Sequence, residues 1–122
     1  MVLVDTSSWI QQLRRTGDRE IRGRVESLLK AGEAAWCPMV RLELWSHVSG
    51  ANERKVLREY EDVLPDLPIS DAVWKRAQDV GDRARHRGIT VPASDLLIFA
   101  CSQHHKVDME YNDKHFDLLA GI

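Results

Sequence analysis

Four carboxylates stand at positions where a purely solvated acidic surface is a poor explanation. Asp5 follows an apolar run at the start of the sequence, and Asp113 follows another segment that is expected to be extended. Glu43 lies among mostly apolar neighbours, and Asp95 lies in the first turn of the most hydrophobic predicted helix. Taken singly, the aspartates could be helix-capping or first-turn residues, and Glu43 could be an exposed helical position. Taken together, the four residues predict one acidic cluster.

A cluster of this kind is typical of a metal site. Several carboxylates in a single crevice repel one another unless a cation holds them. Hard oxygen ligands suit Mg²⁺ or Mn²⁺ better than zinc. We therefore expect a site for Mg²⁺ (or Mn²⁺), with Asp5 and Asp95 as direct ligands because they lie deepest in the predicted crevice. Glu43 and Asp113 are expected to act directly or through water.

Strands and helices that alternate along the chain must position these carboxylates. Apolar residues recur at helical spacing, and the segments between them are expected to be extended at 1–4, 34–36, 67–69, 89–91 and 106–111. Strands separated by helices pair in parallel and are covered by helices on both faces, so the sequence predicts an α/β fold. The ligand crevice of such a sheet lies beyond the carboxyl ends of the strands. Asp5 stands at that position.

Length and composition exclude several classes of protein. The 122 residues are expected to form one domain, 1–122, with a single core. Because the net charge is −2, any contact with nucleic acid must depend on local patches or on a bound cation. No segment resembles a signal peptide or a membrane span, and Cys37 and Cys101 are expected to be reduced core residues. We therefore expect a cytoplasmic protein that does not bind membranes.

Four short motifs, in this order, carry a resemblance to a known family. They are VDTSSWI at 4–10, RLEL at 41–44, SDLLIFA at 94–100 and NDKHF at 112–116. In this respect the chain resembles the PIN-domain family and, within it, the VapC-type toxins. The resemblance covers essentially the whole chain. It implies an α/β/α sandwich with a central, mostly parallel sheet, a metal-dependent ribonuclease acting on single-stranded RNA, a cognate antitoxin as partner, and a homodimer.

The resemblance also assigns roles to individual residues. Asp5, Glu43, Asp95 and Asp113 match the acidic positions of the family, which implies that they form the catalytic site. Thr6 and Ser7 match the small hydroxyl residues that follow the first aspartate, where a hydroxyl could orient a carboxylate or a water molecule. The mechanism implied is metal-assisted hydrolysis of a phosphodiester, in which the ion lowers the pKa of a bound water and neutralises charge on the phosphate.

Position 115 departs from the family. Many members have a second acidic residue two places after the last aspartate, and this chain has His115 there. The site would then have one carboxylate fewer and would hold a second metal ion more weakly. Two interpretations of His115 stay open: it could contact an RNA phosphate, or it could be an exposed histidine at the start of a helix.

Other functions fit the sequence less well. A phosphatase with an aspartate nucleophile at the end of the first strand wants a second aspartate two residues later, where this chain has Ser7. A non-catalytic PIN-like binding module would have no need of all four acidic positions. A solitary PIN-domain nuclease in RNA processing is the main alternative to a toxin. The sequence does not separate these two, but a neighbouring gene for a small DNA-binding antitoxin would.

A basic cluster lies near the end of one predicted helix and has two interpretations. Its members are Arg83, Arg85, His86 and Arg87. It could bind RNA phosphates, or it could simply complement the negative end of the helix dipole.

Overall fold

Three short strands form one parallel sheet in the computed structural model, which describes residues 1–122. The strands are β1 (Val2–Val4), β2 (Ala34–Ala35) and β3 (Asp108–Glu110), and their order is β2-β1-β3. Val2 of β1 is paired with Ala34 of β2 and with Asp108 of β3. The predicted α/β class with a parallel sheet is therefore confirmed. All three strands fall within segments that the sequence indicates as extended.

Helices cover both faces of this sheet. Leu3 and Val4 are neighbours in β1, so their side chains point to opposite faces, and both are fully buried. A strand that is apolar on both faces is typical of a parallel sheet sandwiched between helices. Trp9 and Trp36 are the largest of the fully buried side chains, and their rings pack edge to face with centroids 6.4 Å apart.

Seven helices lie between and after the strands, in the segments where the apolar spacing predicts them. They are α1 (Thr6–Leu13), α2 (Arg19–Lys30), α3 (Pro38–His47), α4 (Ala51–Val63), α5 (Asp71–His86), α6 (Ala93–His105) and α7 (Lys114–Ala120). Gly32 and Gly88 adopt φ angles of +68° and +72° just after α2 and α5. Glycine adopts this left-handed conformation without strain, so both residues are suited to end their helices.

The segment expected to be extended at 89–91 does not become a strand, and neither does the one at 67–69. Only a single parallel bridge forms nearby, between Trp36 and Asp66. The backbone amide of Leu67 donates to the carbonyl of Trp36 at 2.8 Å. The donors of the preceding and the next ladder bonds would be Pro65 and Pro38, which have no backbone N–H, so the ladder does not continue in either direction.

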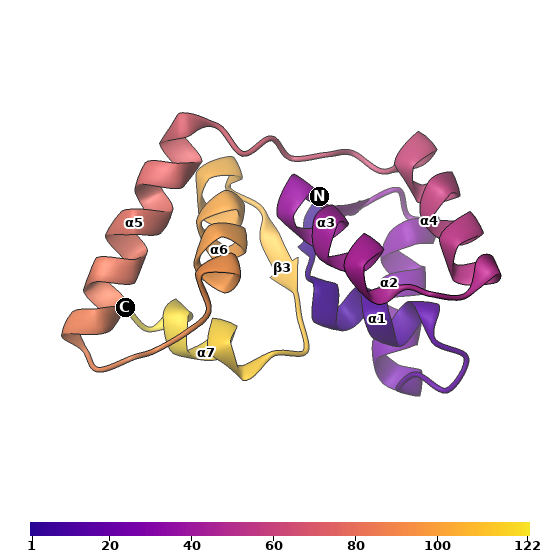
Figure 1. The fold of residues 1–122 in the computed structure, drawn as a ribbon, viewed down its shortest axis with the longest axis horizontal. Coiled ribbons are helices and arrows are strands. Elements are labelled where there is room, and N and C mark those ends of the chain that lie inside the picture. Colours follow the sequence, from indigo (N-terminus) through magenta and orange to yellow (C-terminus); the bar gives the residue numbers. More distant parts are fainter.

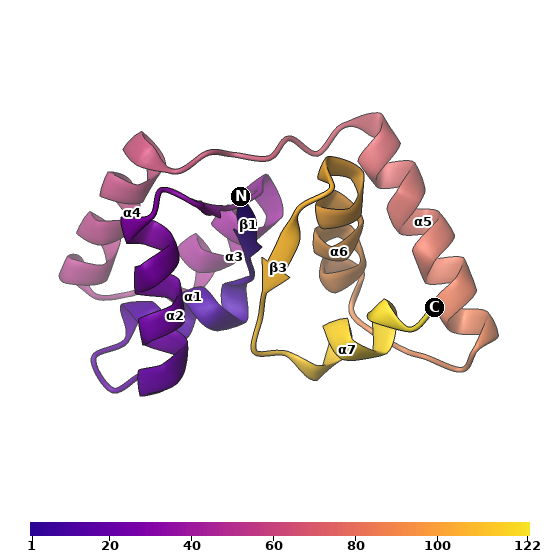
Figure 2. The ribbon, with the colours of Figure 1, turned by 180° about the vertical axis from the view of Figure 1, so that it is seen from behind.

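The helices fall into two groups on either side of β3. Figures 1 and 2 show α1 to α4 on one side, and α5, α6 and α7 on the other. An extended segment between α4 and α5 joins the two groups along the top of both views. Figure 2 shows the starts of α6 and α7 towards the lower edge of the sheet, where β1 and β3 end. No helix is long and apolar enough to cross a membrane.

Candidate metal centre

Asp5 is positioned by the end of β1 and the start of α1. Its backbone amide donates to the carbonyl of Glu110 at 2.8 Å, which continues the pairing of β1 with β3 by one residue. Its side chain caps α1, because Oδ2 accepts hydrogen bonds from the amide and the hydroxyl of Ser7, at 3.1 Å and 2.7 Å. Oδ1 is buried and has no hydrogen-bond partner. A helix cap needs only one of the two oxygens, so the cap does not account for Oδ1.

Burial makes the charge of Asp5 costly. The residue is only 3% exposed. Burial, opposed by the hydrogen bonds from Ser7 and assisted by the nearby charge of Asp95, raises the pKa of the Asp5 carboxyl from its ordinary value of 3.8 to about 6. A buried carboxylate with a free oxygen beside a second carboxylate is an environment that a cation would stabilise.

Glu43 reaches the same region from α3. Its Oε1 accepts a hydrogen bond from the hydroxyl of Thr6 at 2.7 Å, across 37 residues of sequence. Because Thr6 directly follows Asp5, this bond fixes the Glu43 carboxylate close to the end of β1. Its negative charge also acts on Asp95. Thr6 is itself buried, so the hydroxyl has a defined position.

Asp95, Asp113 and His115 form the tightest part of the cluster. The Nδ1 atom of His115 donates to Oδ2 of Asp95 at 2.7 Å and lies 3.0 Å from Oδ1 of Asp113. Asp113 caps α7 by accepting from the backbone amide of His115 at 2.9 Å. One possible ligand atom from each of the three residues lies within 4.8 Å of the others. Their arrangement therefore allows all three to contact a single ion.

The electrostatics of this group follow from burial and close charges. Burial raises the pKa of Asp95, and the hydrogen bond from His115 opposes that change. The charges of Asp113 and Glu43 also raise the pKa of Asp95. The hydrogen bond to Asp95 raises the pKa of His115, as do the charges of Asp113 and Asp95. A positive charge is therefore favoured between Asp95, Asp113 and His115.

The loop before α7 is tied to the start of α1. Ser7 donates its hydroxyl proton to Asp5 and accepts a hydrogen bond from the backbone amide of Asn112 at 2.9 Å. The loop that carries Asp113 is thereby held next to Asp5. Together with the bond from Thr6 to Glu43, this contact brings all four predicted carboxylates to one edge of the sheet.

The contacts of His115 are not predicted by the sequence. Its side chain is 39% exposed, so it is neither buried nor free in solvent. Both of its close partners are acidic site residues, so its present contacts are with the cluster. In the sequence, His115 is marked out by standing where many members of the family have an acidic residue. Spacing alone does not show which way the ring points.

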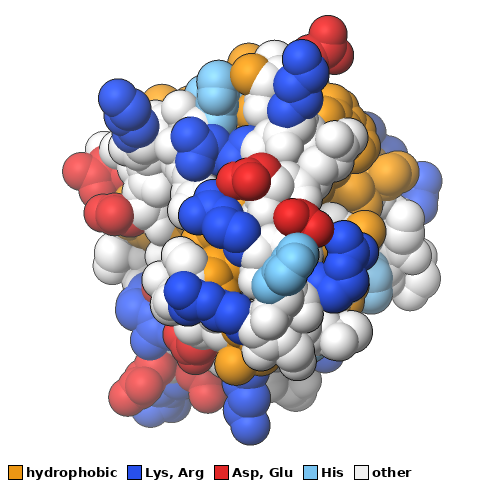
Figure 3. Space-filling model, turned by 90° about the vertical axis from the view of Figure 1, so that its left-hand side faces the viewer, with side chains coloured by type: hydrophobic (Ala, Val, Ile, Leu, Met, Phe, Trp, Pro, Cys, Tyr) orange, Lys and Arg blue, Asp and Glu red, His pale blue; other side chains and the backbone are white.

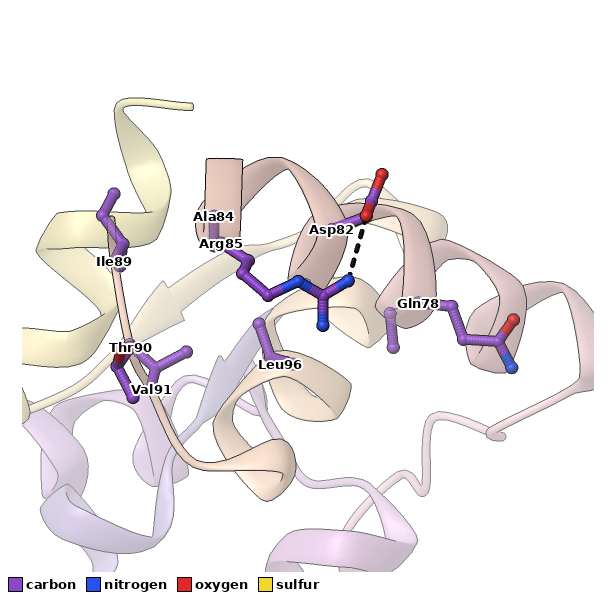
Figure 4. Close-up of a pocket in the computed structure, with 10 residues that line it drawn as sticks. Gln78, Asp82, Ala84, Arg85, Ile89, Thr90, Val91 and Leu96 are labelled. Carbon is purple, nitrogen blue, oxygen red and sulfur yellow. Dashed lines mark hydrogen bonds and ion pairs between the residues drawn. The ribbon is translucent and has the colours of Figure 1, made fainter. Parts of the chain in front are cut away.

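The carboxylate cluster is separate from a pocket of about 470 Å³ beside α5. Figure 4 shows Leu96 and the segment 89–91 lining this pocket opposite α5, with Arg85 paired to Asp82 at 3.0 Å. On the face that α5 covers, Figure 3 shows Lys and Arg side chains mixed with acidic and His side chains. Arg83 pairs with Asp79 at 2.7 Å. These pairings favour a local structural role for the basic cluster over phosphate binding.

Comparisons with known proteins agree with this geometry. The PIN domain family matches residues 2–122. The VapC ribonuclease Mb1587 of Mycobacterium bovis is 31% identical over 127 residues, which cover all of this chain and 93% of that protein. Ribonuclease VapC21 of Mycobacterium tuberculosis is 30% identical over 107 residues, or 84% of this chain and 76% of its own length.

Solved structures share the fold at lower sequence identity. The FitAcB structure from Neisseria gonorrhoeae superposes with a TM-score of 0.74 at 18% identity, over 98% of this chain and 94% of that one. VapC20 of Mycobacterium tuberculosis, a toxin that cleaves the sarcin–ricin loop, superposes with a TM-score of 0.72 at 17% identity, over 99% of this chain and 95% of that one. The family match extends over nearly the full length, and the relatives are similar over most of the sequence. The chain therefore belongs to the PIN-domain family.

Proposed function

We propose that this protein is a metal-dependent endoribonuclease that acts as the toxin of a toxin–antitoxin pair. The observation that carries the proposal is the acidic edge of the sheet, where Asp5 has a buried oxygen without a partner beside Asp95. Relatives that are about 31% identical over the whole chain are named VapC ribonucleases, which supports the same conclusion. A solitary nuclease in RNA processing and a non-catalytic binding module are less well supported.

The residues of the site have different roles in the proposed reaction. Asp5 and Asp95 would hold a divalent ion, with Glu43 and Asp113 contributing directly or through water. When bound, the ion supplies positive charge beside the phosphodiester and lowers the pKa of a water molecule. Ser7 fixes the carboxylate of Asp5 through its hydroxyl and amide. These groups are positioned before substrate binds, so little reorganisation is needed during the reaction.

RNA is the proposed substrate, and Mg²⁺ or Mn²⁺ is the proposed ion. The purified protein should cleave single-stranded RNA with either ion and stop when EDTA removes it. Attack by water should leave 5′-phosphate and 3′-hydroxyl ends. Asp95→Asn removes a charge from the centre of the cluster and should abolish cleavage, whereas Asp79→Asn, on the outer face of α5, should not. Cleavage that persists in EDTA and yields 2′,3′-cyclic phosphates would contradict the proposal.

A cognate antitoxin is the proposed protein partner. The fold is shared with toxin–antitoxin complexes, including VapBC2 of Rickettsia felis bound to promoter DNA. We expect the antitoxin to bury an apolar segment on this domain and to place an arginine near the carboxylates, because a guanidinium can bind a carboxylate at two points. Expression of the toxin alone should arrest growth, and co-expression of the antitoxin should restore it. Normal growth with abundant soluble protein and no partner gene would favour RNA processing.

A homodimer is proposed from the family resemblance and from one exposed apolar surface. Leu42 on α3 and Trp74 on α5 are 61% and 52% exposed. They line a groove of about 380 Å³ together with Pro38, Met39, Ile69 and Leu97. Large apolar side chains gathered in this way often mark an interface. Trp74→Lys should convert a dimer to a monomer in analytical ultracentrifugation, whereas Val63→Lys, at an exposed apolar residue outside this groove, should leave the mass unchanged.

A further inference from the structure

We infer that His115 is a ligand of the same ion as Asp95 and Asp113, so that this centre combines carboxylates with an imidazole and prefers a first-row transition-metal ion such as Mn²⁺ to Mg²⁺. The inference rests on the proposed metal-dependent function, and it concerns the position at which this chain departs from its family. It changes the expected ion, because the ligand set would no longer consist of oxygen atoms alone.

The geometry of His115 suits ligation. Its Nδ1 atom, which is the atom facing the carboxylates, lies 2.7 Å from Oδ2 of Asp95 and 3.0 Å from Oδ1 of Asp113. Neighbouring ligands on an octahedral ion with bonds of about 2.1 Å lie about 3 Å apart. These spacings therefore match ligands on adjacent corners of one coordination shell. The backbone of His115 also donates to Asp113, which fixes the start of α7 relative to that carboxylate.

A second observation points to a cation at the same place. Oδ1 of Asp5 is buried without a hydrogen-bond partner, and the residue as a whole is 3% exposed. The hydroxyl of Ser7 joins Asp5 to the backbone amide of Asn112, which directly precedes Asp113, so this oxygen lies at the same edge of the sheet as the other carboxylates. A buried charged oxygen normally has a hydrogen-bond donor or a cation beside it. The chain supplies neither to Oδ1, which leaves a position for an ion from solution.

A protonated His115 could itself act as the counter-charge, and the structure allows this alternative to be weighed. Its Nδ1 atom contacts Asp95 and Asp113 but makes no hydrogen bond to Asp5, whose Oδ1 stays unpaired. One imidazolium would also supply a single positive charge to a cluster of four carboxylates. A divalent ion held by the imidazole and the carboxylates neutralises the cluster more completely.

The imidazole nitrogen makes the site selective. Mg²⁺ is a hard ion that prefers oxygen ligands and gives up its water molecules reluctantly. Transition-metal ions accept imidazole more readily, and Mn²⁺ is the member of that series that most resembles Mg²⁺ in its use of carboxylate and water ligands. Replacing His115 with aspartate would restore an oxygen ligand and shift the preference towards Mg²⁺.

The test measures binding of Mn²⁺ to the full chain by electron paramagnetic resonance, with Mg²⁺ as competitor. Electron spin echo envelope modulation of the bound Mn²⁺ should show coupling to a nitrogen nucleus in the wild type. His115→Asp should remove this coupling and lower the ratio of the Mg²⁺ to the Mn²⁺ dissociation constant by about tenfold or more. His104→Asp makes the same change at an exposed histidine at the end of α6 and should change neither quantity.

The possible results are distinguishable from one another. If His115→Asp does not fold, as judged by circular dichroism, His115→Gln preserves the size of the side chain and should also abolish the nitrogen coupling. Mn²⁺ that binds to the wild type without nitrogen coupling would overturn the role of His115 and leave the ribonuclease proposal standing. Nitrogen coupling that persists in both variants would do the same. A protein that binds no Mn²⁺ would overturn the inference, and loss of RNA cleavage with Mg²⁺ as well would overturn the proposed function.

Discussion

Replacing Asp5 with asparagine should stabilise the metal-free protein. The pKa of the buried Asp5 carboxyl is about 6, compared with an ordinary value of 3.8. At about 1.36 kcal/mol for each pH unit, this difference means that the ionised side chain destabilises the fold by about 3 kcal/mol near neutral pH. Asparagine has no charge and can still cap α1 by accepting from Ser7. The stronger bonds from Ser7 to a charged oxygen are lost, so the expected net gain is about 1–3 kcal/mol.

The gain should depend on pH in a defined direction. The pKa of Asp5 is raised in the folded protein, so protonation of this carboxyl favours folding. Its stabilising effect is complete below the unfolded pKa of 3.8 and is lost as the pH rises through about 6. Asparagine does not titrate, so the difference in unfolding free energy between the variant and the wild type should be small near pH 4 and largest above about pH 6.

Chemical denaturation in EDTA across this pH range measures the difference directly. A gain of about 1–3 kcal/mol corresponds to a rise in melting temperature of roughly 3–10 °C for a chain of this size. Mn²⁺ should then raise the melting temperature of the wild type, and most of that rise should be missing in Asp5→Asn.

Asp18 provides the matched control, because it caps α2 by accepting from Ile21 at 3.0 Å and is exposed. Asp18→Asn should change stability by only a few tenths of a kcal/mol at about neutral pH. If Asp5→Asn behaves in the same way, with no dependence on pH and an unchanged response to Mn²⁺, Asp5 is only a helix cap. The electrostatic reasoning would then be wrong.

Substitutions at three further positions test the support of the site and the packing of the fold. Thr6→Val keeps the shape of the side chain but removes the hydroxyl that binds Glu43. It should lower the unfolding free energy by about 1–2 kcal/mol and reduce RNA cleavage. Thr6→Ser keeps the hydroxyl and should retain both the stability and the cleavage activity. Gly17→Ala should destabilise the protein by more than about 1 kcal/mol in thermal melts, because the added Cβ would lie 1.8 Å from the carbonyl oxygen of Gln11. Gly23→Ala, inside α2 with nothing within 4 Å of the added atom, should instead stabilise it by about 0.5–1 kcal/mol.

The position of Asp5 is predictable because it depends on local rules. An apolar run of four residues is long enough for a buried strand, and the polar residues that follow it favour the start of a helix. Parallel strands then place Asp5 at the edge where ligands bind. Asp95 and Asp113 follow from the same kind of argument, since each stands where a helix begins. Such predictions need only the periodicity of the chain and the direction of the strands.

The surroundings of His115 and Glu43 depend on contacts that no local rule describes. The hydroxyl of Thr6 meets Glu43 across 37 residues, and the ring of His115 meets Asp95 across 20 residues. Which of several carboxylates a side chain approaches is decided by the angle at which two helices enter the site. Sequence spacing leaves that angle undetermined. The sequence therefore predicts which residues gather at the sheet edge, but not how they pair.

The unpaired oxygen of Asp5 connects stability with function. Burying this carboxylate costs about 3 kcal/mol when nothing neutralises it, and natural domains are stable by only about 5–15 kcal/mol in total. A helix cap does not explain a buried charge that destabilises the fold this much, because asparagine or serine would cap α1 without any charge. A positive charge that enters the site would offset part of this destabilisation, whether it belongs to a divalent ion or to the arginine of a protein partner. The same carboxylates would then bind the catalytic ion and an inhibitory side chain, and the two should exclude each other.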